Sequence, residues 1–456
     1  MFFLLLFIFA LTRIIPFIKN AAPLGYDTGL YRGFIYNFIQ NLPHFDIVSI
    51  AKNEPPLLYV LADALHYCNL SIDFFLGYFY YLCTILFALL LFYFLKKKYS
   101  SAAGLAGLFL LTISLAQFEA YWQLFYKNIL AFIITLLIFY FLEKKNYWLC
   151  FILGGALGGF HHMSFVPLAG AIFLAGIFLK EKRKSYLFLF LGICLLALAC
   201  YAKNFNVITH YLPFTQEKLQ NMANLDKSDK TGMFWNISDY LFYAIWYLPL
   251  LFFALYKKIK ARKLDYLFWY FVIVFLIVAS QLFFYKRFLI HLDFIAIILI
   301  APILVDLFKY IFKKNNILIY SLFFLWALFL MIRIFIFSFT TDAYISAEEF
   351  QAIKNLKNLP LEATVISTNN IIAPWIYGYS EHKNIWPGKF KNDPWSYREW
   401  QTFWHTNIPQ ERYDLLDKVA KPVYIFVPAG HSLKSVLEND ADFIEYSDYL
   451  YEYIGY

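Results

Sequence analysis

Long apolar runs separated by short polar segments fill most of the chain up to Phe339. A helix that crosses a bilayer needs about 20 consecutive, mostly apolar residues. The first run lacks a basic start and carries Arg13, so we expect an uncleaved span there and not a signal peptide. The pattern predicts eleven transmembrane helices, at residues 1–18, 72–95, 101–118, 129–142, 147–160, 164–179, 185–201, 241–256, 266–284, 288–308 and 317–339.

Two parts of the chain are far more polar than these runs, namely a long first loop at 19–71 and the tail that follows the last run. A polar segment of this length does not belong in the hydrocarbon core of a membrane. The pattern therefore predicts two domains. A transmembrane domain covers 1–339 and includes the long loop, and a small α/β domain covers 340–456.

The tail contains recognisable signals for helices and strands. Ser346 and Glu349 have the spacing of a capping box, which predicts a helix at 348–356. Short apolar runs bounded by turn residues predict buried strands. These runs lie at 364–368 and 423–427.

The composition indicates that a bilayer is the main solvent of this protein. Apolar residues make up 61% and charged residues 15% of the chain, whereas soluble domains have roughly half and a quarter. Intrinsic disorder, collagen and disulfide-rich scaffolds are excluded, since hydrophobicity is high while Gly, Pro and Cys are few. The net charge of +8 lies in short clusters between apolar runs, so we expect no nucleic-acid partner. The cysteines form no CxxC motif or Cys/His pair, and we predict no metal and no cofactor.

Lys and Arg are concentrated in alternate loops, and this asymmetry predicts the orientation of the chain. By the positive-inside rule, the loops rich in Lys and Arg are cytoplasmic. The N-terminus is then cytoplasmic, and with eleven spans the C-terminal domain is extracytoplasmic. The loops rich in Lys and Arg are 96–98, 144–145, 180–184, 257–263 and 309–314.

Acidic residues in the predicted outer segments are candidates for catalysis, because ionisable groups near membrane depth are costly. Asp27 follows the first span, between Gly25 and Gly29, and its carboxylate would suit a base that takes a proton from an acceptor hydroxyl. The alternative is a turn or a helix cap. The other candidate carboxylates are Glu54, ahead of a predicted interfacial helix, and Glu119 in the second outer loop.

Basic residues in the outer segments are candidates for binding a phosphate or pyrophosphate. Lys286 and Arg287 are adjacent cations at the predicted start of the tenth span, where the helix dipole also favours an anion. The alternative for each cation is a side chain that snorkels toward lipid headgroups. Further candidates at outer span ends are Lys127, His161, His162 and His291.

The order of these motifs resembles that of the GT-C class of integral-membrane glycosyltransferases. The most similar groups are the protein O-mannosyltransferases and the lipid A aminoarabinose transferases, which use polyprenyl-phosphate sugars. The resemblance extends over nearly the whole chain, although each motif is short. The matching parts are the segments 25–31, 55–59, 124–128 and 286–288 and the outer C-terminal domain.

The resemblance implies roles for individual residues. Asp27 is the implied catalytic base, although mannosyltransferases of this class often have an Asp-Asp or Asp-Glu pair at that place. Glu119 is the acid available in the second outer loop, where the family commonly has one. The implied phosphate ligands are Lys127, Lys286 and Arg287, and further substrate contacts are expected from Tyr26, Tyr31, Arg32, His161, His162 and His291.

The implied fold is a polytopic α-helical membrane protein, GT-C-like, with a small C-terminal extracytoplasmic α/β domain. The implied reaction moves a sugar from a polyprenyl-phosphate donor to a protein, lipid or glycan acceptor by an inverting displacement, among membrane lipids and without a cofactor. The first alternative is a transporter or flippase for a lipid-linked sugar or small solute, which often has matched halves that are not evident here. The second alternative, a structural scaffold, does not explain why the candidate acids and cations share one face.

Overall fold

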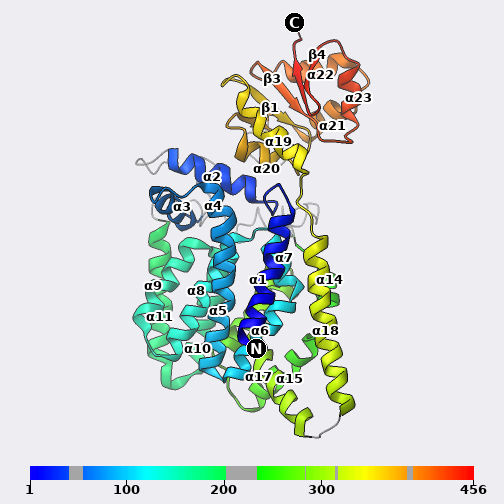
Figure 1. Ribbon diagram of the computed structural model, residues 1–456. Coiled ribbons are helices and arrows are strands. Elements are labelled where there is room, and N and C mark those ends of the chain that lie inside the picture. Colours follow the sequence, from blue (N-terminus) through cyan, green and yellow to red (C-terminus); the bar gives the residue numbers. More distant parts are fainter. Residues whose placement is uncertain (41–54, 202–233, 283, 314–316, 388–393, 456) are drawn as a thin grey trace. The chain divides into compact units, whose positions relative to one another are not determined.

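The computed structural model describes residues 1–40, 55–201, 234–282, 284–313, 317–387 and 394–455. The chain forms two compact units, whose elements are labelled in Figure 1. The helical unit consists of Met1–Pro16, Lys52–Leu61 and Tyr78–Thr341, and the mixed unit of Phe17–Ala51, Ala62–Gly77 and Asp342–Tyr456. The domain boundary predicted between 339 and 340 stays a prediction.

Each of the eleven apolar runs coincides with one helix or with consecutive helices. Among the described residues, six helices are long and apolar enough to cross a membrane, or up to eight if each of two bent pairs is one span. The predicted multi-pass helical class is thereby confirmed, while the number eleven stays a prediction. Before the C-terminal domain, the chain begins with α1 (Phe2–Lys19). Further along the chain come α3 (Leu57–Tyr67) and α4 (Ile72–Phe74), and a π-helical turn continues α4 into α5 (Tyr80–Lys98). The described α-helices that follow, up to residue 340, are α6 (Ser101–Ile113), α7 (Leu115–Trp122), α8 (Tyr126–Glu143), α9 (Tyr147–Phe160), α10 (His162–Phe178), α11 (Arg183–Cys200), α14 (Ile237–Ala244), α15 (Leu248–Lys260), α16 (Tyr266–Ala279), α17 (Tyr285–Lys313) and α18 (Ile317–Thr340).

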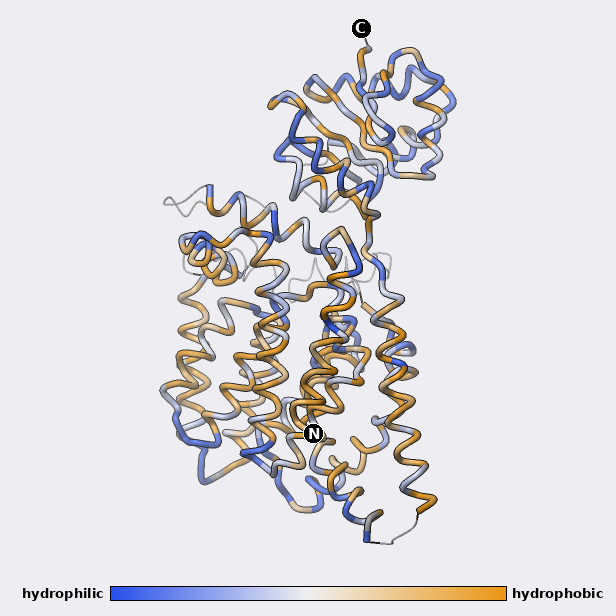
Figure 2. The backbone as a smooth tube through the Cα atoms, in the orientation of Figure 1, coloured by the Kyte–Doolittle hydropathy of each residue, from blue (hydrophilic) through white to orange (hydrophobic). Residues whose placement is uncertain are grey.

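Apolar residues follow the helices of the helical unit, and hydrophilic residues gather at the connections between them (Figure 2). The apolar window of α17 is 94% buried, because α6, α15 and α16 pack around it. A helix that is apolar on all sides belongs in the centre of such a bundle. The window of α18 is only 17% buried, which leaves most of its apolar surface for lipid.

Two pairs of consecutive helices in the helical unit are sharply bent. α6 and α7 meet at Ser114 with a bend of 58°, and α14 and α15 form a bend of 88° with Tyr247 directly before α15. A break leaves backbone carbonyls on one side and N–H groups on the other without partners in the helix. On the N–H side of the first break, Ser114 caps α7 by accepting a hydrogen bond of 3.1 Å from the backbone N–H of Gln117.

Arg13 of α1 supplies the partners on the carbonyl side of the same break. Its guanidinium donates to the carbonyl oxygens of Leu111 at 3.3 Å and Thr112 at 3.2 Å, which belong to the last turn of α6. A cation at the C-terminal end of a helix also interacts favourably with the helix dipole. The Arg13 side chain is fully buried, with the ring of Phe9 4.3 Å away. Arg13 therefore stabilises the broken conformation from inside the bundle.

The mixed unit contains a five-stranded sheet in the order β2-β1-β3-β5-β4. β1 pairs in parallel with β2 and β3, while the β3–β5 and β4–β5 pairs are antiparallel. β1 and β3 are buried at every position, as expected for central strands that are covered on both faces. The two predicted strands are thus confirmed as β1 (Thr364–Ser367) and β3 (Val423–Phe426), and the others are β2 (Lys383–Ile385), β4 (Phe443–Ser447) and β5 (Leu450–Tyr453).

The first helix of the C-terminal domain begins with the predicted capping box. Ser346 accepts a hydrogen bond of 3.1 Å from the N–H of Glu349, and the Glu349 carboxylate accepts one of 2.9 Å from the N–H of Ser346. The helix that follows is α19 (Ala347–Asn355), which confirms the prediction. The other helices that lie wholly in the mixed unit are α20 (Ala373–Tyr379), α21 (Tyr397–His405), α22 (Pro409–Leu416), α23 (Leu433–Glu438), α2 (Thr28–Gln40) and the short α4.

Candidate functional site

Three helix N-termini in the helical unit carry basic residues. Lys127 lies in the first turn of α8, Arg287 in the first turn of α17, and His161 directly before α10. The Arg287 guanidinium is 5.1 Å from the ring centroid of Phe125, the residue before α8. Lys127 is only 6% exposed, with its Nζ 5.5 Å from the ring centroid of Tyr59. The positive ends of helices together with two cations form an environment that favours an anion.

The titration of His161 reflects how these basic groups converge. Burial, and then the neighbouring His162, His291, Lys127 and Arg287, lower the pKa of His161 well below its ordinary value. All four of these neighbours are basic, so a proton on His161 would add positive charge to a positive site. These surroundings therefore favour the neutral form of His161.

A chain of hydrogen bonds connects His161 with the interior of the helical unit. Nδ1 of His161 lies 2.6 Å from Oγ of Ser164, which lies 3.2 Å from Nε2 of His291. Nδ1 of His291 lies 2.9 Å from the hydroxyl of Tyr270, and Nδ2 of the Asn128 amide lies 3.2 Å from Nε2 of His291. Each of these five side chains is at most 5% exposed. We call the series from Tyr270 through His291 and Ser164 to His161 the relay.

Asp293 forms a second buried polar centre on α17. Its carboxylate accepts hydrogen bonds from Ser114 at 2.7 Å, from the Gln117 side chain at 3.1 Å, and from the hydroxyl of Tyr247. Ser114 lies at the α6–α7 break, and Tyr247 lies at the α14–α15 break. The fully buried carboxylate of Asp293 therefore connects both bent helix pairs, α6–α7 and α14–α15, to α17 by hydrogen bonds.

Two further predicted site residues, Lys286 and Glu119, differ in their surroundings from the basic residues near His161. Consecutive residues of a helix point about 100° apart, so Lys286 and Arg287 face different directions on α17. Arg287 is among the groups that contribute most to lowering the pKa of His161. Glu119 lies in α7 and accepts a hydrogen bond of 2.5 Å from the side chain of Gln123.

Asp27 belongs to the mixed unit and lies directly before α2. Its backbone carbonyl accepts a hydrogen bond of 2.9 Å from the N–H of Tyr31, as expected of the residue that precedes a first helical turn. Tyr26 donates to the carbonyl oxygen of Asn370 at 3.0 Å, and burial together with the charge of Asp27 raises the pKa of Tyr26 to about 12. This position is compatible with both the catalytic and the capping interpretation of Asp27. Glu54 lies outside the described residues.

Arg32 is engaged by three groups of the mixed unit. Its Nε donates to Asp73 at 3.1 Å, a terminal nitrogen donates to the carbonyl oxygen of Gly378, and the guanidinium lies 4.3 Å from the ring centroid of Tyr379. The Tyr379 hydroxyl also donates to Asp73 at 3.2 Å. Substrate binding by Arg32 would therefore require the loss of contacts that join α2 to α20.

The backbones of α2 and α20 come into close contact at two glycines. A Cβ atom on Gly29 would overlap the backbone carbonyl of Pro374, and one on Gly378 would overlap the carbonyl of Gly29. Only residues without a side chain allow the two backbones to come this close. The contact fixes the start of α2, and with it Asp27, to the C-terminal domain.

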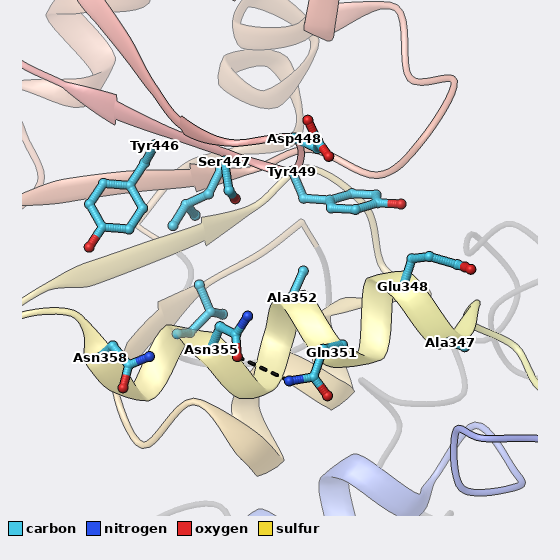
Figure 3. A pocket seen from close by; sticks show the side chains of 12 residues that line it. Ala347, Glu348, Gln351, Ala352, Asn355, Asn358, Tyr446, Ser447, Asp448 and Tyr449 are labelled. Carbon is cyan, nitrogen blue, oxygen red and sulfur yellow. Dashed lines mark hydrogen bonds between the residues drawn. The ribbon is translucent and has the colours of Figure 1, made fainter.

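A groove of about 730 Å³ lies in the mixed unit, between α19 and the turn that joins β4 to β5 (Figure 3). Glu348, Gln351 and Asn355 line it from the helix, and Tyr446 and Asp448 line it from the hairpin. Gln351 donates a hydrogen bond of 3.1 Å to Asn355. None of the described residues that line the groove is Lys, Arg or His, so its chemistry does not suit a phosphate.

Several residues that organise the polar centres were not predicted as site residues. Arg13 and Asp293 carried a usable signal, because each is a charge inside or beside an apolar run. Ser164, Tyr270 and Asn128 carried none, since uncharged polar residues are common in such helices. Among the described residues, no group of three or more His, Cys, Asp or Glu side chains is placed to hold a metal ion.

No protein-family model and no curated protein sequence matches this chain. Its structure is similar to that of AglB, the oligosaccharyltransferase of Archaeoglobus fulgidus. The apo crystal structure of AglB gives a TM-score of 0.63 at 12% sequence identity and covers 92% of this chain and 69% of that one. Its complex with an inhibitory peptide and a dolichol-phosphate gives 0.61 at 12% identity, with the same coverage. This similarity confirms the expected fold class of a multi-span helical protein with a small C-terminal α/β domain.

Proposed function

We propose that this protein is a GT-C membrane glycosyltransferase that moves a sugar from a polyprenyl-phosphate donor to an acceptor on the outer face of the membrane. The observation that carries the proposal is the group formed by Lys127, Arg287 and His161 at three helix N-termini, in a chain that shares the fold of an oligosaccharyltransferase. Such a group suits the phosphate of a lipid-linked donor better than a neutral solute. A structure of AglB holds a dolichol-phosphate, which supports this choice of ligand.

In the proposed reaction, the acceptor attacks the anomeric carbon of the sugar from the side opposite the phosphate. The bond between that carbon and the phosphate oxygen breaks, the phosphate leaves with both electrons, and the configuration inverts. Lys127 and Arg287 stabilise the charge that develops on the leaving phosphate. Asp27 takes the proton that the acceptor releases. The scheme needs no metal ion, because the two cations supply the positive charge.

The proposal includes an orientation and a choice among related reactions. The N-terminus is cytoplasmic, and the C-terminal domain is extracytoplasmic, as the distribution of Lys and Arg predicts. The acceptor is a protein, a lipid or a glycan. A donor panel of polyprenyl-phosphate mannose, glucose and aminoarabinose separates the O-mannosyltransferase kind from the aminoarabinose transferase kind.

The decisive variant is Asp27→Asn in the full chain, reconstituted in lipid with the donor panel. Asn keeps the shape of the side chain but cannot accept a full proton, and loss of a general base costs about 10²–10⁴ in rate. A helix cap predicts an unchanged rate, because Asn caps as well as Asp. The matched control is Asp342→Asn, which removes the carboxylate that accepts a 2.6 Å hydrogen bond from Lys19 in the same unit. Full transfer by Asp27→Asn would move the search for the base to Glu54 or Glu119.

The two broken spans favour a second candidate, a transporter or flippase for a lipid-linked sugar. Discontinuous helices that end near the middle of a membrane are typical of secondary transporters. A carrier moves its lipid-linked substrate between leaflets and leaves the bond between sugar and phosphate intact. Leaflet-to-leaflet movement in vesicles without sugar transfer, unaffected by Asp27→Asn, would therefore favour the carrier over the enzyme.

A further inference from the structure

The direction of the hydrogen bond between Tyr270 and His291 follows from the burial of Tyr270. The hydroxyl is fully buried, and within the described part of the chain its one hydrogen-bond partner is Nδ1 of His291. If the hydroxyl accepted this bond, its own proton would be buried without a partner, which is unfavourable. Tyr270 therefore donates, and Nδ1 of His291 accepts.

This direction fixes the protons of the next two residues. The His291 ring packs against Phe132 and Phe288 and makes no ion pair with a described carboxylate, so a neutral ring is favoured. A neutral His that accepts at Nδ1 carries its proton on Nε2 and donates it to Oγ of Ser164, 3.2 Å away. Nδ2 of Asn128 lies 3.2 Å from the same Nε2, and this proton assignment requires the amide to be turned by 180°, so that its oxygen accepts from the N–H.

The last hydrogen bond of the relay determines which ring nitrogen of His161 carries the proton. Because Ser164 accepts from His291, its hydroxyl proton is available for Nδ1 of His161, 2.6 Å away. Nδ1 of His161 then has no proton, and the neutral ring carries its proton on Nε2. Nε2 has no hydrogen-bond partner among the described residues. An N–H donor without a partner in the described part of the chain thus lies near the basic groups that include Lys127 and Arg287.

We propose that Tyr270 is a positioning residue, which acts through His291 and Ser164 to keep His161 as a neutral Nε2–H donor for a phosphate oxygen of the lipid-linked sugar. A neutral donor adds a hydrogen bond to the anion without adding a third charge beside Lys127 and Arg287. The identity of the anion rests on the proposed function. The proton positions along the relay do not depend on it.

The proton positions are measured by NMR on the full chain in lipid nanodiscs, with ¹⁵N-labelled histidine and His161→Gln to assign the signals. In the parent protein we expect a protonated Nε2 and a bare Nδ1 on His161. Tyr270→Phe removes the first donor of the relay, so we expect a mixture of the two neutral forms of His161. The affinity for geranyl phosphate, used as the probe, should fall about twofold to tenfold, as for the loss of one neutral hydrogen bond.

Tyr266→Phe is the matched control, because Tyr266 is one turn away on the same helix and donates to Glu143 and not to the relay. It should change neither the His161 signals nor the affinity for geranyl phosphate. Ser164→Ala interrupts the relay at another point and should weaken binding as Tyr270→Phe does. This second variant keeps the test decisive if Tyr270→Phe does not fold.

Three results would overturn the inference. The first is a proton on Nδ1 of His161 in the parent protein, and the second is a His161 ring unchanged by both relay variants. The third is an equal loss of affinity in Tyr266→Phe, which would show an effect of packing. Failure of the proposed function gives a different result from failure of this inference. The parent protein would then carry the proton on Nε2 of His161, as expected, but would not bind geranyl phosphate.

Discussion

The carbonyl group of Gly29, in the first loop, occupies the place where a side chain on Gly378, in the C-terminal domain, would begin. The two residues are far apart in the sequence, and their contact makes α2 part of the mixed unit. Asp27 precedes this contact by two residues. The C-terminal domain therefore holds the proposed catalytic base in addition to forming its own core.

Gly378→Ala tests this connection. The added methyl group meets backbone, which cannot move aside as a side chain can, and such overpacking costs about 1–3 kcal/mol. We expect a less stable mixed unit and, if Asp27 is the base, a fall in sugar transfer at least as large as the fall in stability. Thermal unfolding and transfer assays on the full chain measure the two effects.

The control for this variant is Gly77→Ala, also in the mixed unit. Its added methyl group would meet ring atoms of Phe17 at 3.0–3.1 Å, and a ring can shift. A smaller loss of stability is expected. Equal stability of Gly378→Ala and the parent would contradict the backbone contact.

Arg13→Met tests whether Arg13 maintains the break between α6 and α7. The variant keeps an apolar side chain of similar length but leaves the carbonyls of Leu111 and Thr112 without their donors. Hydrogen bonds that involve a charged group contribute about 1.5–3 kcal/mol, so we expect a loss of that size in unfolding measured in mixed micelles. Lys19→Met on the same helix removes only an exposed ion pair with Asp342, for which about 0–1 kcal/mol is expected. Similar losses in the two variants would refute the role of Arg13.

Much of the fold was predictable because hydrophobic burial leaves a regular pattern in the sequence. The eleven apolar runs, the capping box at Ser346 and the two central strands each depend on residues close together in the chain. The break at Ser114 was missed, since its run is mostly apolar over its whole length and Arg13, which contacts the break, belongs to another helix. Long-range contacts of this kind leave no local pattern.

The residue types of the candidate site were predictable from the sequence, but the contacts between their side chains were not. Lys127, Arg287 and His161 were predicted as cations or donors at outer span ends, and in the structure both cations contribute to lowering the pKa of His161. Lys286 was paired with Arg287 because the two are adjacent in the sequence, whereas a helix directs them apart. The Tyr270 hydroxyl gave no sign in the sequence of its bond to His291, because its position depends on how α16 packs against α17.

The predicted orientation is tested by labelling intact cells with an impermeant thiol reagent. Cys68 is exposed and must first be replaced by Ser, so that it does not contribute background. In that chain, Ser435→Cys places an exposed thiol on the C-terminal domain and should react before lysis. Ser101→Cys, exposed beside a loop rich in Lys, should react only after lysis. The reverse pattern would contradict the positive-inside assignment and the outer location of the proposed site.

Lys286 and Arg287 are adjacent in the sequence, but the proposed site predicts different effects on phosphate binding when each is replaced. If Arg287 alone contacts the phosphate, Arg287→Gln should weaken geranyl phosphate binding about tenfold or more, as expected for a charge-assisted contact of 1.5–3 kcal/mol. Lys286→Gln removes the same formal charge one residue away and should change the affinity little. The double variant should then match Arg287→Gln, since a residue without a contact has no coupling to lose. Equal effects of the two single variants would instead favour general attraction by positive charge, which raising the salt concentration would screen. A larger effect of Lys286→Gln would show that the anion binds on the other side of α17, away from His161 and the relay.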